Sequence, residues 1–276
     1  MTIFAGTSKG LFRLEPAGAR SVLAEPHVRE LQRLQGVLWA GTANGLFRST
    51  DDGRHWEPSG LQGLAVWQIR GEATGPTLYA GVEPAALYRS TDGGRTWTEL
   101  PTLAAHPDAQ RWCVPVQPRL PPRARALAVD PDNPRRLWVG VEVGGMLRSD
   151  DAGEHWTLTL PGENPDIHML CVHPADPRTL FVSTGYGRFD GVAEMIEGNA
   201  GVFRSDDAGA TWRYAWRGVT PRYSRPMCID PRSPHVLTVA SAPTAFSSHR
   251  DEGGAQAALY RSDDGGARWR SLGDPA

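Results

Sequence analysis

The sequence predicts an all-β protein, a six-bladed β-propeller of four-stranded antiparallel blades. Three observations lead to this fold. A nine-residue motif recurs five times, short runs rich in β-branched and aromatic residues flank each copy, and no segment has a helical period of useful length. Four short strands repeated every 41 to 59 residues are typical of propeller blades. We therefore expect one domain over residues 1–276, with blades near 1–29, 30–60, 61–103, 120–161, 165–216 and 222–273.

The recurring motif reads Ser-x-Asp-x-Gly-x-x-Trp, as in RSTDGGRTW at 89–97. Ser and Asp side chains bond to backbone amides in tight turns, Gly adopts conformations closed to other residues, and Trp buries a large ring. A catalytic carboxylate would not recur together with its turn, so we interpret the motif as a hairpin corner. Its turn acids are Asp51, Asp92, Asp151, Asp207 and Asp264.

Strand-like runs surround each motif. TLYAG (77–81) and ALYRS (86–90) precede the second copy, and equivalent pairs precede the others. Later repeats add an earlier run such as ALAVD (126–130), and a further run follows the Trp. The N-terminal TIFAGTSKGLFRL (2–14) matches VLWAGTANGLFRS (37–49) but lacks the motif. The first blade is therefore expected to be degenerate, without an obvious innermost strand.

The motif resembles the Asp-box, or BNR repeat, of sialidase-like propellers, and the resemblance covers nearly the whole chain. Such repeats occur in sialidases, xyloglucan-cleaving enzymes, sorting receptors and photosystem assembly factors, so the resemblance implies a fold and leaves the activity open. In that family the Asp-box is a structural corner away from the ligand site. A sialidase-like enzyme would add an arginine triad, a Tyr–Glu pair and an acidic proton donor. No Tyr–Glu pair can be assigned by motif and an N-terminal Arg-Ile-Pro element is absent, so a true sialidase is not expected.

Composition limits the classes of partner. The net charge of −2 argues against nucleic-acid binding through bulk positive charge. No run approaches the roughly 20 apolar residues that cross a bilayer, and no targeting segment is visible, so we expect a cytoplasmic protein with no membrane partner. Cys113, Cys171 and Cys228 are spaced neither as a disulfide framework nor as a zinc motif, and Cys113 is the thiol to test for reactivity.

Irregular sequence is expected to gather on one face of the propeller. The Asp-box corner shares its face with the turn that joins the two innermost strands. The opposite face then carries the long segments 101–125, 184–201 and 241–258. Long loops in a compact repeat protein usually have a task, although a lid that only covers the channel is the alternative.

Alignment of the innermost strands places polar residues at the mouth of the channel on this face. Asp130, His173 and Asp230 occupy the equivalent turn position in three successive blades. In each blade, the residues five and seven positions before this one should lie on the same side of the innermost strand. Those residues are Arg123, Arg125, Asp166, His168, Tyr223 and Arg225. Leu127, Leu170 and Met227 should lie deeper in the channel than these polar residues. Polar groups above an apolar floor are typical of a small-ligand site, although a ring of side chains that pair only with each other is the alternative.

Each candidate residue has an expected role. Guanidinium groups match carboxylate and phosphate, so Arg123, Arg125 and Arg225 predict an anionic ligand. Candidate catalytic residues are His168 as general base, Asp166 as its orienting acid, and Tyr223. Further ligand contacts are expected from the loop residues Trp112, Arg188 and His249. We expect neither a metal nor a cofactor; a transition metal at His106, His168 and His249 is the minor alternative.

Three functions remain open from the sequence. The first is a propeller that binds a small anionic molecule or a partner at the channel mouth. The second is a hydrolase or lyase that acts on an acidic sugar or another small anion at the same place. A protein-interaction platform is a third hypothesis.

Overall fold

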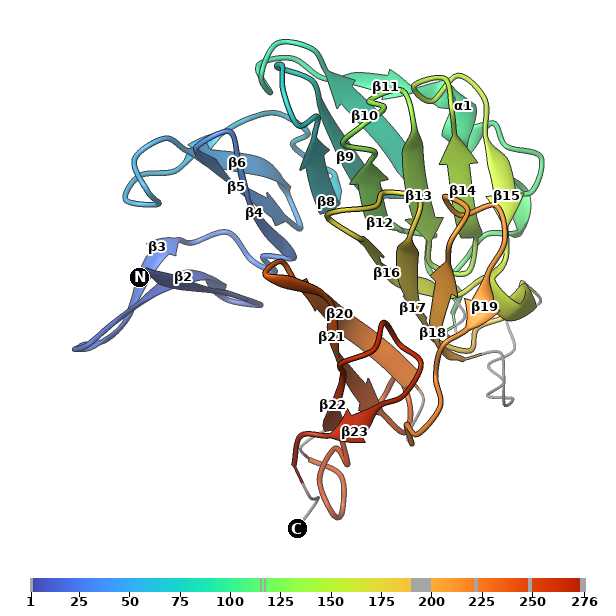
Figure 1. Ribbon diagram of the computed structural model, residues 1–276. Coiled ribbons are helices and arrows are strands. Elements are labelled where there is room, and N and C mark those ends of the chain that lie inside the picture. Colours follow the sequence, from blue (N-terminus) through green and yellow to red (C-terminus); the bar gives the residue numbers. More distant parts are fainter. Residues whose placement is uncertain are drawn as a thin grey trace. The chain divides into compact units, whose positions relative to one another are not determined.

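The computed structural model describes residues 2–114, 116, 118–189, 200–220, 223–247 and 250–273 (Figure 1). The chain forms two compact units, Met1–Ala105 and His106–Ala276, and each is described separately. The described helices are the one-turn α1 (Pro101–Ala104) and two short 3-10 turns, Ala109–Arg111 and Pro161–Glu163. None of the described helices could span a membrane. The remaining elements are strands in six antiparallel sheets, so the all-β six-bladed fold class is confirmed.

The first unit contains three blades. The first blade has the strand order β1-β2-β3. Because TIFAG matches VLWAG, β1 corresponds to the second strand of a complete blade, and the predicted lack of an innermost strand is confirmed in the described residues. The other two blades have four strands each. The strands are β1 Ile3–Thr7, β2 Gly10–Glu15, β3 Gly18–Leu23, β4 Glu30–Leu34, β5 Val37–Thr42, β6 Gly45–Ser49, β7 Glu57–Pro58, β8 Ala65–Gly71, β9 Leu78–Glu83, β10 Ala86–Ser90 and β11 Thr98–Leu100.

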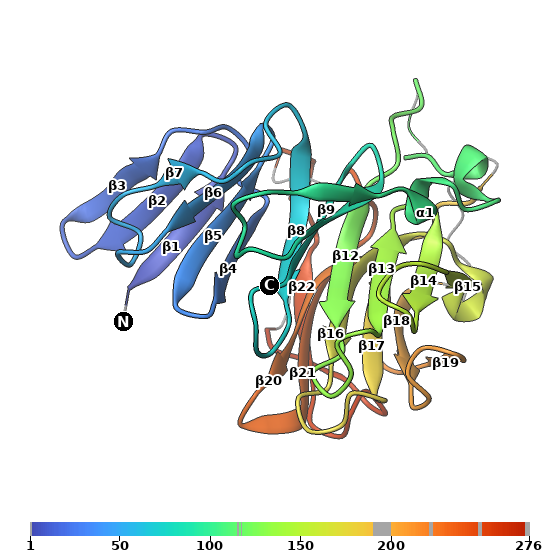
Figure 2. The same ribbon diagram turned by 90° about the horizontal axis from the view of Figure 1, so that it is seen from above.

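The second unit contains three complete blades, whose strands pair in chain order. Figure 2 shows β12, β13 and β14 side by side in the first of them. The innermost strands are neighbours, with β16 in contact with both β12 and β20. The strands are β12 Ala124–Val129, β13 Leu137–Val141, β14 Gly145–Ser149, β15 Thr157–Thr159, β16 Ile167–Val172, β17 Leu180–Thr184, β18 Gly201–Ser205, β19 Arg213–Tyr214, β20 Tyr223–Asp230, β21 Ser233–Ala242, β22 Ala258–Ser262 and β23 Arg270–Ser271.

The Asp-box motifs form the corners that the sequence predicts. In the fourth copy the hydroxyl of Ser205 donates to Oδ1 of Asp207 at 2.7 Å and accepts the N–H of Gly209 at 2.8 Å. Hydrogen bonds from the side chain and backbone of Thr211 lower the pKa of Asp207 to about 2. The same serine-to-aspartate bond recurs in the other copies, at Asp51, Asp92, Asp151 and Asp264. These carboxylates are occupied by their own turns.

Trp97, Trp212 and Trp269 of the motif also connect successive blades, whereas Nε1 of Trp56 donates within its own turn, to the carbonyl oxygen of Gly53. Nε1 of Trp97 donates to the carbonyl oxygen of Ser59 at 2.8 Å, and Nε1 of Trp269 donates to that of Ala215 at 2.8 Å. Each acceptor belongs to the preceding blade of the same unit. In these three copies the motif therefore shapes one blade and fixes it to the one before.

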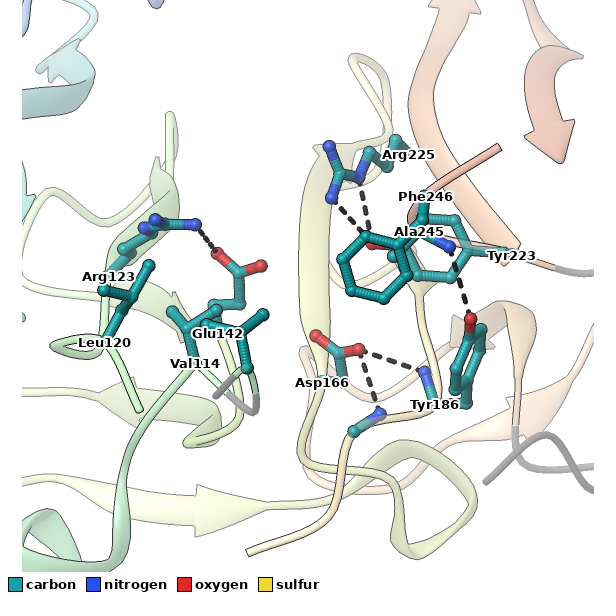
Figure 3. Close-up of a pocket in the computed structure, with 12 residues that line it drawn as sticks. Val114, Leu120, Arg123, Glu142, Asp166, Tyr186, Tyr223, Arg225, Ala245 and Phe246 are labelled. Atoms are coloured by element: carbon teal, nitrogen blue, oxygen red, sulfur yellow. Dashed lines mark hydrogen bonds and ion pairs between the residues drawn. The ribbon is translucent and has the colours of Figure 1, made fainter. Parts of the chain in front are cut away.

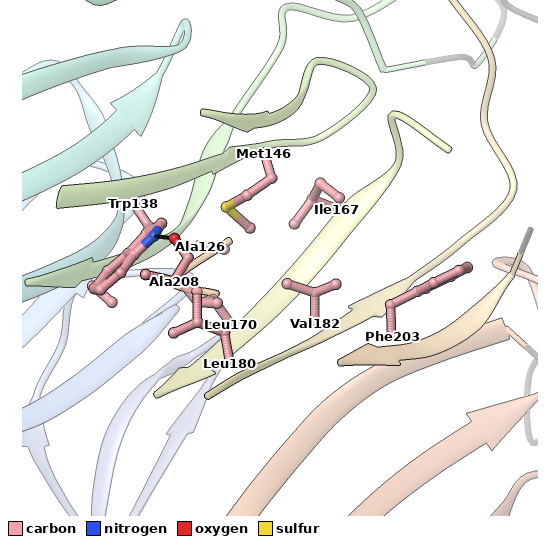
Figure 4. Close-up of a cluster of buried hydrophobic side chains, with 10 residues drawn as sticks. Ala126, Trp138, Met146, Ile167, Leu170, Leu180, Val182, Phe203 and Ala208 are labelled. Atoms are coloured by element: carbon pink, nitrogen blue, oxygen red, sulfur yellow. Dashed lines mark hydrogen bonds between the residues drawn. The ribbon is translucent and has the colours of Figure 1, made fainter. Parts of the chain in front are cut away.

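Apolar side chains fill the space between neighbouring blades (Figure 4). Trp138, Ile167 and Phe203 are at most 1% exposed, and Nε1 of Trp138 donates to the carbonyl oxygen of Ala208 at 2.9 Å. Burying one large apolar side chain stabilises a protein by about 1.5–3 kcal/mol. This packing holds β12 and β16 in a defined relation and so fixes the residues at their N-terminal ends.

Candidate functional site

A cavity of about 230 Å³ lies in the second unit, where its innermost strands begin (Figure 3). Its polar wall is formed by Arg123, Glu142, Asp166, Tyr223 and Arg225. The rest of the wall comes from the long segments, through Val114, Val116, Leu120, Tyr186, Gly187, Ala245 and Phe246. The structure therefore brings four of the six predicted strand residues together with the three long segments: Arg123, Asp166, Tyr223 and Arg225.

The innermost strands are irregular at the residues that lead to this cavity. The register of β12 against β13 shifts at Arg125, and that of β16 against β17 shifts at His168. The register of β20 against β21 shifts across Arg225 and Pro226. A bulge adds a residue to one strand and turns the neighbouring side chains. The predicted regular alternation was therefore wrong, because Arg125 and His168 are not among the residues that line the cavity.

Glu142 joins two of the predicted arginines. Its carboxylate, 6% exposed, accepts from Nη1 of Arg123 at 3.2 Å and lies 3.0 Å from Nη1 of Arg125. Glu142 directly follows β13, which pairs Val141 with Ala124, and this register brings the acid beside both guanidinium groups. The sequence interpretation missed Glu142. Its signal was an acid at the end of RLWVGVE, next to the strand that carries two arginines.

Asp166 is held as an anion. Its Oδ2 accepts the backbone N–H groups of Tyr186 and Gly187, both at 3.0 Å, and its Oδ1 lies 3.2 Å from Nε2 of His168. Burial would raise the pKa of Asp166. The charge and hydrogen bond of His168, the Gly187 N–H and the charge of Arg125 outweigh burial and lower the pKa to about 2. Asp166 therefore cannot supply a proton near neutral pH.

His168 lies outside the cavity wall and contacts two residues that line the cavity, Asp166 and Tyr223. Its Nδ1 carries a proton, because it lies 2.5 Å from the carbonyl oxygen of Ser224, which only accepts hydrogen bonds. Its Nε2 lies between Oδ1 of Asp166 at 3.2 Å and Oη of Tyr223 at 3.3 Å. The side chain is 1% exposed. This burial suits positioning of Asp166 and Tyr223 better than direct contact with a ligand.

Arg225 differs from the other two arginines. Its Nε and Nη2 donate to Oη of Tyr223 at 3.0 and 2.8 Å. Burial raises the pKa of Tyr223 to about 12, so the acceptor is a neutral phenol. Arg225 is exposed, and within the described part of the chain it forms no ion pair with a carboxylate. A full positive charge therefore faces the cavity, and the charges of Glu142 and Asp166 act on it without a described ion pair.

The two long loops meet at the rim of the cavity. The N–H of Ala245 donates to Oη of Tyr186 at 3.2 Å, and the ring of Tyr186 packs edge-on against Tyr223 with 5.2 Å between centroids. Phe246 is 74% exposed beside them. The predicted apolar floor was wrong, because the apolar lining comes from these loops. The residues predicted for the floor are buried outside the cavity wall: Leu127, Leu170 and Met227.

The remaining predicted ligand residues lie elsewhere. Trp112 is buried and stacks on His106, with ring centroids 5.8 Å apart, and neither lines the cavity. Arg188 lines a separate surface hollow with Arg111. His249 lies outside the described residues. The structure therefore brings neither Trp112 nor Arg188 to this cavity, while the alternative of a metal at His106, His168 and His249 remains a prediction.

A different set of donor atoms lies close together. Glu142, Asp166 and His168 each place one possible metal ligand within 4.8 Å of the others. The carboxylate of Glu142 already faces the guanidinium groups of Arg123 and Arg125. A divalent cation would be repelled by both of these charges. The charge of the site fits an anion better than a metal ion.

Cys113 is not poised for reaction. It is buried, and burial raises the pKa of its thiol. A raised pKa reduces the thiolate fraction, which is the reactive form. The exposed thiol is that of Cys228.

Comparisons with known proteins agree with the motif and the fold. The BNR/Asp-box repeat model matches residues 88–99. A xyloglucanase of Paenibacillus sp is 27% identical over 235 residues, which is 74% of this chain and 20% of that protein. Xyloglucanase Xgh74A of Acetivibrio thermocellus is 29% identical over 217 residues, which is 65% of this chain and 24% of that protein. The chain thus spans a fifth to a quarter of the length of these relatives.

A solved structure shows the same fold. The GH74 xyloglucanase from Xanthomonas campestris aligns with a TM-score of 0.70 and 18% identity, covering 98% of this chain and 43% of that chain. The chain is therefore an Asp-box β-propeller whose fold is similar to that of GH74 xyloglucanases.

Proposed function

We propose that the protein binds a small organic anion, with a carboxylated sugar as the best fit, in the cavity of the second unit. One observation carries the proposal. Among the described contacts, the Arg225 guanidinium group donates to the neutral Tyr223 and forms no ion pair with a carboxylate, and Arg123 and Arg125 both face the carboxylate of Glu142. A guanidinium group matches the planar geometry of a carboxylate, and its two parallel N–H donors favour bidentate binding.

The anionic residues of the wall favour a ligand that also carries hydroxyl groups. Glu142 and Asp166 would repel a second carboxylate placed against them. Each carboxylate has about four lone-pair sites, so both retain capacity to accept bonds from ligand hydroxyls. A uronic acid supplies one carboxylate for Arg225 and several hydroxyl donors for the acids.

Calorimetric titration of uronic acids tests this function. We expect galacturonate or glucuronate to bind, the neutral galactose and glucose to bind much more weakly, and added salt to weaken the uronate complex. Arg225→Gln should weaken uronate binding roughly 10- to 150-fold, because a hydrogen bond to a charged group contributes about 1.5–3 kcal/mol. Arg232→Gln is the matched control, since Arg232 follows the opposite end of β20 and pairs with Asp230. Equal effects of the two substitutions would reject the site.

A hydrolase that acts on a glycoside is the second candidate, and the similarity to xyloglucanases favours it. Most glycosidases use two carboxyl groups, one of them protonated. In this cavity Asp166 has a pKa of about 2 and therefore does not suit the role of acid. Release of reducing ends from xyloglucan or from acidic oligosaccharides would support the hydrolase. Loss of that release in Asp166→Asn would assign it to this cavity.

A further inference from the structure

We propose that the ligand is an acidic saccharide of at least two units, in which a neutral sugar follows the acidic one. This inference rests on the proposed function and extends it. The acidic unit would occupy the cavity described above. The neutral unit would occupy a second hollow that adjoins it.

The second hollow, of about 220 Å³, shares a wall with the first. Tyr223, Arg225 and Ala245 line both hollows. A ligand whose carboxylate binds Arg225 can therefore extend directly into the second hollow.

The chemistry of the second hollow differs from that of the first. Apart from the shared Arg225, none of the described residues in its lining carries a charged side chain. Besides the shared Tyr223, three residues contribute hydroxyl groups, namely Ser241, Thr244 and Ser247. The methyl groups of alanines, among them Ala257, form much of the remainder. Such a surface suits an uncharged group that carries hydroxyls and offers no partner for a second carboxylate.

The hydroxyl groups retain hydrogen-bonding capacity. Oγ of Ser241 lies 3.3 Å from Oγ of Ser224. The hydroxyls of Thr244 and Ser247 lie 3.2 Å apart, and each also accepts one backbone N–H, from Phe246 and Thr244 respectively. Each hydroxyl has one donor and two acceptor sites, so these contacts leave sites for a ligand.

Phe246 gives a further reason to expect a sugar. It belongs to the same loop as Thr244 and Ser247, lines the first cavity, and is 74% exposed. An exposed aromatic ring beside polar groups offers an apolar surface to a ligand. The apolar C–H face of a pyranose ring fits this surface, whereas a small inorganic anion gains nothing from it.

Titration with matched saccharides tests the inference. The probes are galacturonate, galacturonosyl-rhamnose, in which the second unit is neutral, and digalacturonate, in which it is charged. We expect galacturonosyl-rhamnose to bind at least about tenfold more tightly than galacturonate. The affinity of digalacturonate should exceed that of galacturonate by a smaller factor. Equal affinities for galacturonate and the mixed disaccharide would overturn the proposal that a neutral sugar binds in the second hollow. They would leave the proposed binding of an anion in the first cavity intact. Absence of binding by all three would overturn both proposals.

Filling the second hollow provides the matching variant. Ala257→Trp should remove the advantage of the mixed disaccharide and change the affinity for galacturonate less than about twofold. Ala267→Trp, at an exposed position in an Asp-box turn, is the control and should keep the advantage. Ser247→Trp should repeat the effect from a second position, which guards against a folding defect in one variant. If both filling variants keep the advantage, the neutral unit does not bind there.

Discussion

Replacement of Asp166 by asparagine should destabilise the protein in a way that depends on pH. The carboxylate accepts two backbone N–H groups and faces His168, and these interactions lower its pKa from the usual 3.8 to about 2. This difference corresponds to about 2 kcal/mol of folding free energy, since a tenfold change in an equilibrium constant is worth about 1.4 kcal/mol. Asparagine keeps the shape and one acceptor but loses the charge.

The sign of the pH dependence follows from the lowered pKa. The folded protein holds the ionised form more strongly than the unfolded chain does. The stabilisation is therefore complete above about pH 4 and is lost as the pH falls toward 2. Asp166→Asn should be about 2 kcal/mol less stable than the parent protein at pH 7, and this gap should close between pH 4 and pH 2.

Urea unfolding at a series of pH values, followed by tryptophan fluorescence, measures this gap. Asp132→Asn removes an exposed carboxylate and is the control, with a change expected within about 0.5 kcal/mol at every pH. A gap of the same size at pH 7 and pH 2.5 would refute the argument from the pKa. The absence of any gap at pH 7 would refute the described environment of Asp166.

Three further outcomes are expected. Gly185→Ala should abolish uronate binding and destabilise the protein by about 1–3 kcal/mol, because the Cβ of the new alanine would overlap the carboxylate of Asp166. Calorimetric titration measures the loss of binding, and thermal melting measures the loss of stability. Ser205→Ala should cost about 1–3 kcal/mol in urea unfolding, because it leaves the buried N–H four residues later without its acceptor. Iodoacetamide at pH 8, followed by mass spectrometry, should label Cys228 well before Cys113; the reverse order would contradict the buried thiol.

The blades could be predicted because their corners are local. The bonds of Ser205 to Asp207 and to Gly209 span two and four residues, so a single copy of the motif determines its own turn. Each predicted blade range contains one observed sheet. That the whole chain forms one domain remains a prediction.

The site could be predicted only in part, because it depends on register. Arg123, Asp166 and Tyr223 reach the cavity as expected, since each stands where an innermost strand begins. Arg125 and His168 lie at bulges, and a bulge of this kind requires no particular residue, so the sequence contains no sign of it.

The positions of Glu142, Trp112 and Arg188 could not be predicted for a similar reason. Glu142 reaches the arginines only through the pairing of Val141 with Ala124, which joins two strands. Trp112 and Arg188 belong to irregular segments, where no strand period determines the direction of a side chain. Long loops indicated the correct side of the blades but not which of their residues enter the cavity.

A crystal structure of the protein with galacturonosyl-rhamnose tests the central claim most directly. The account predicts the carboxylate within hydrogen-bonding distance of the Arg225 guanidinium group and the neutral sugar beside Ser241 and Ala257. A saccharide bound away from Arg225, or an empty cavity at a saturating concentration, would contradict it.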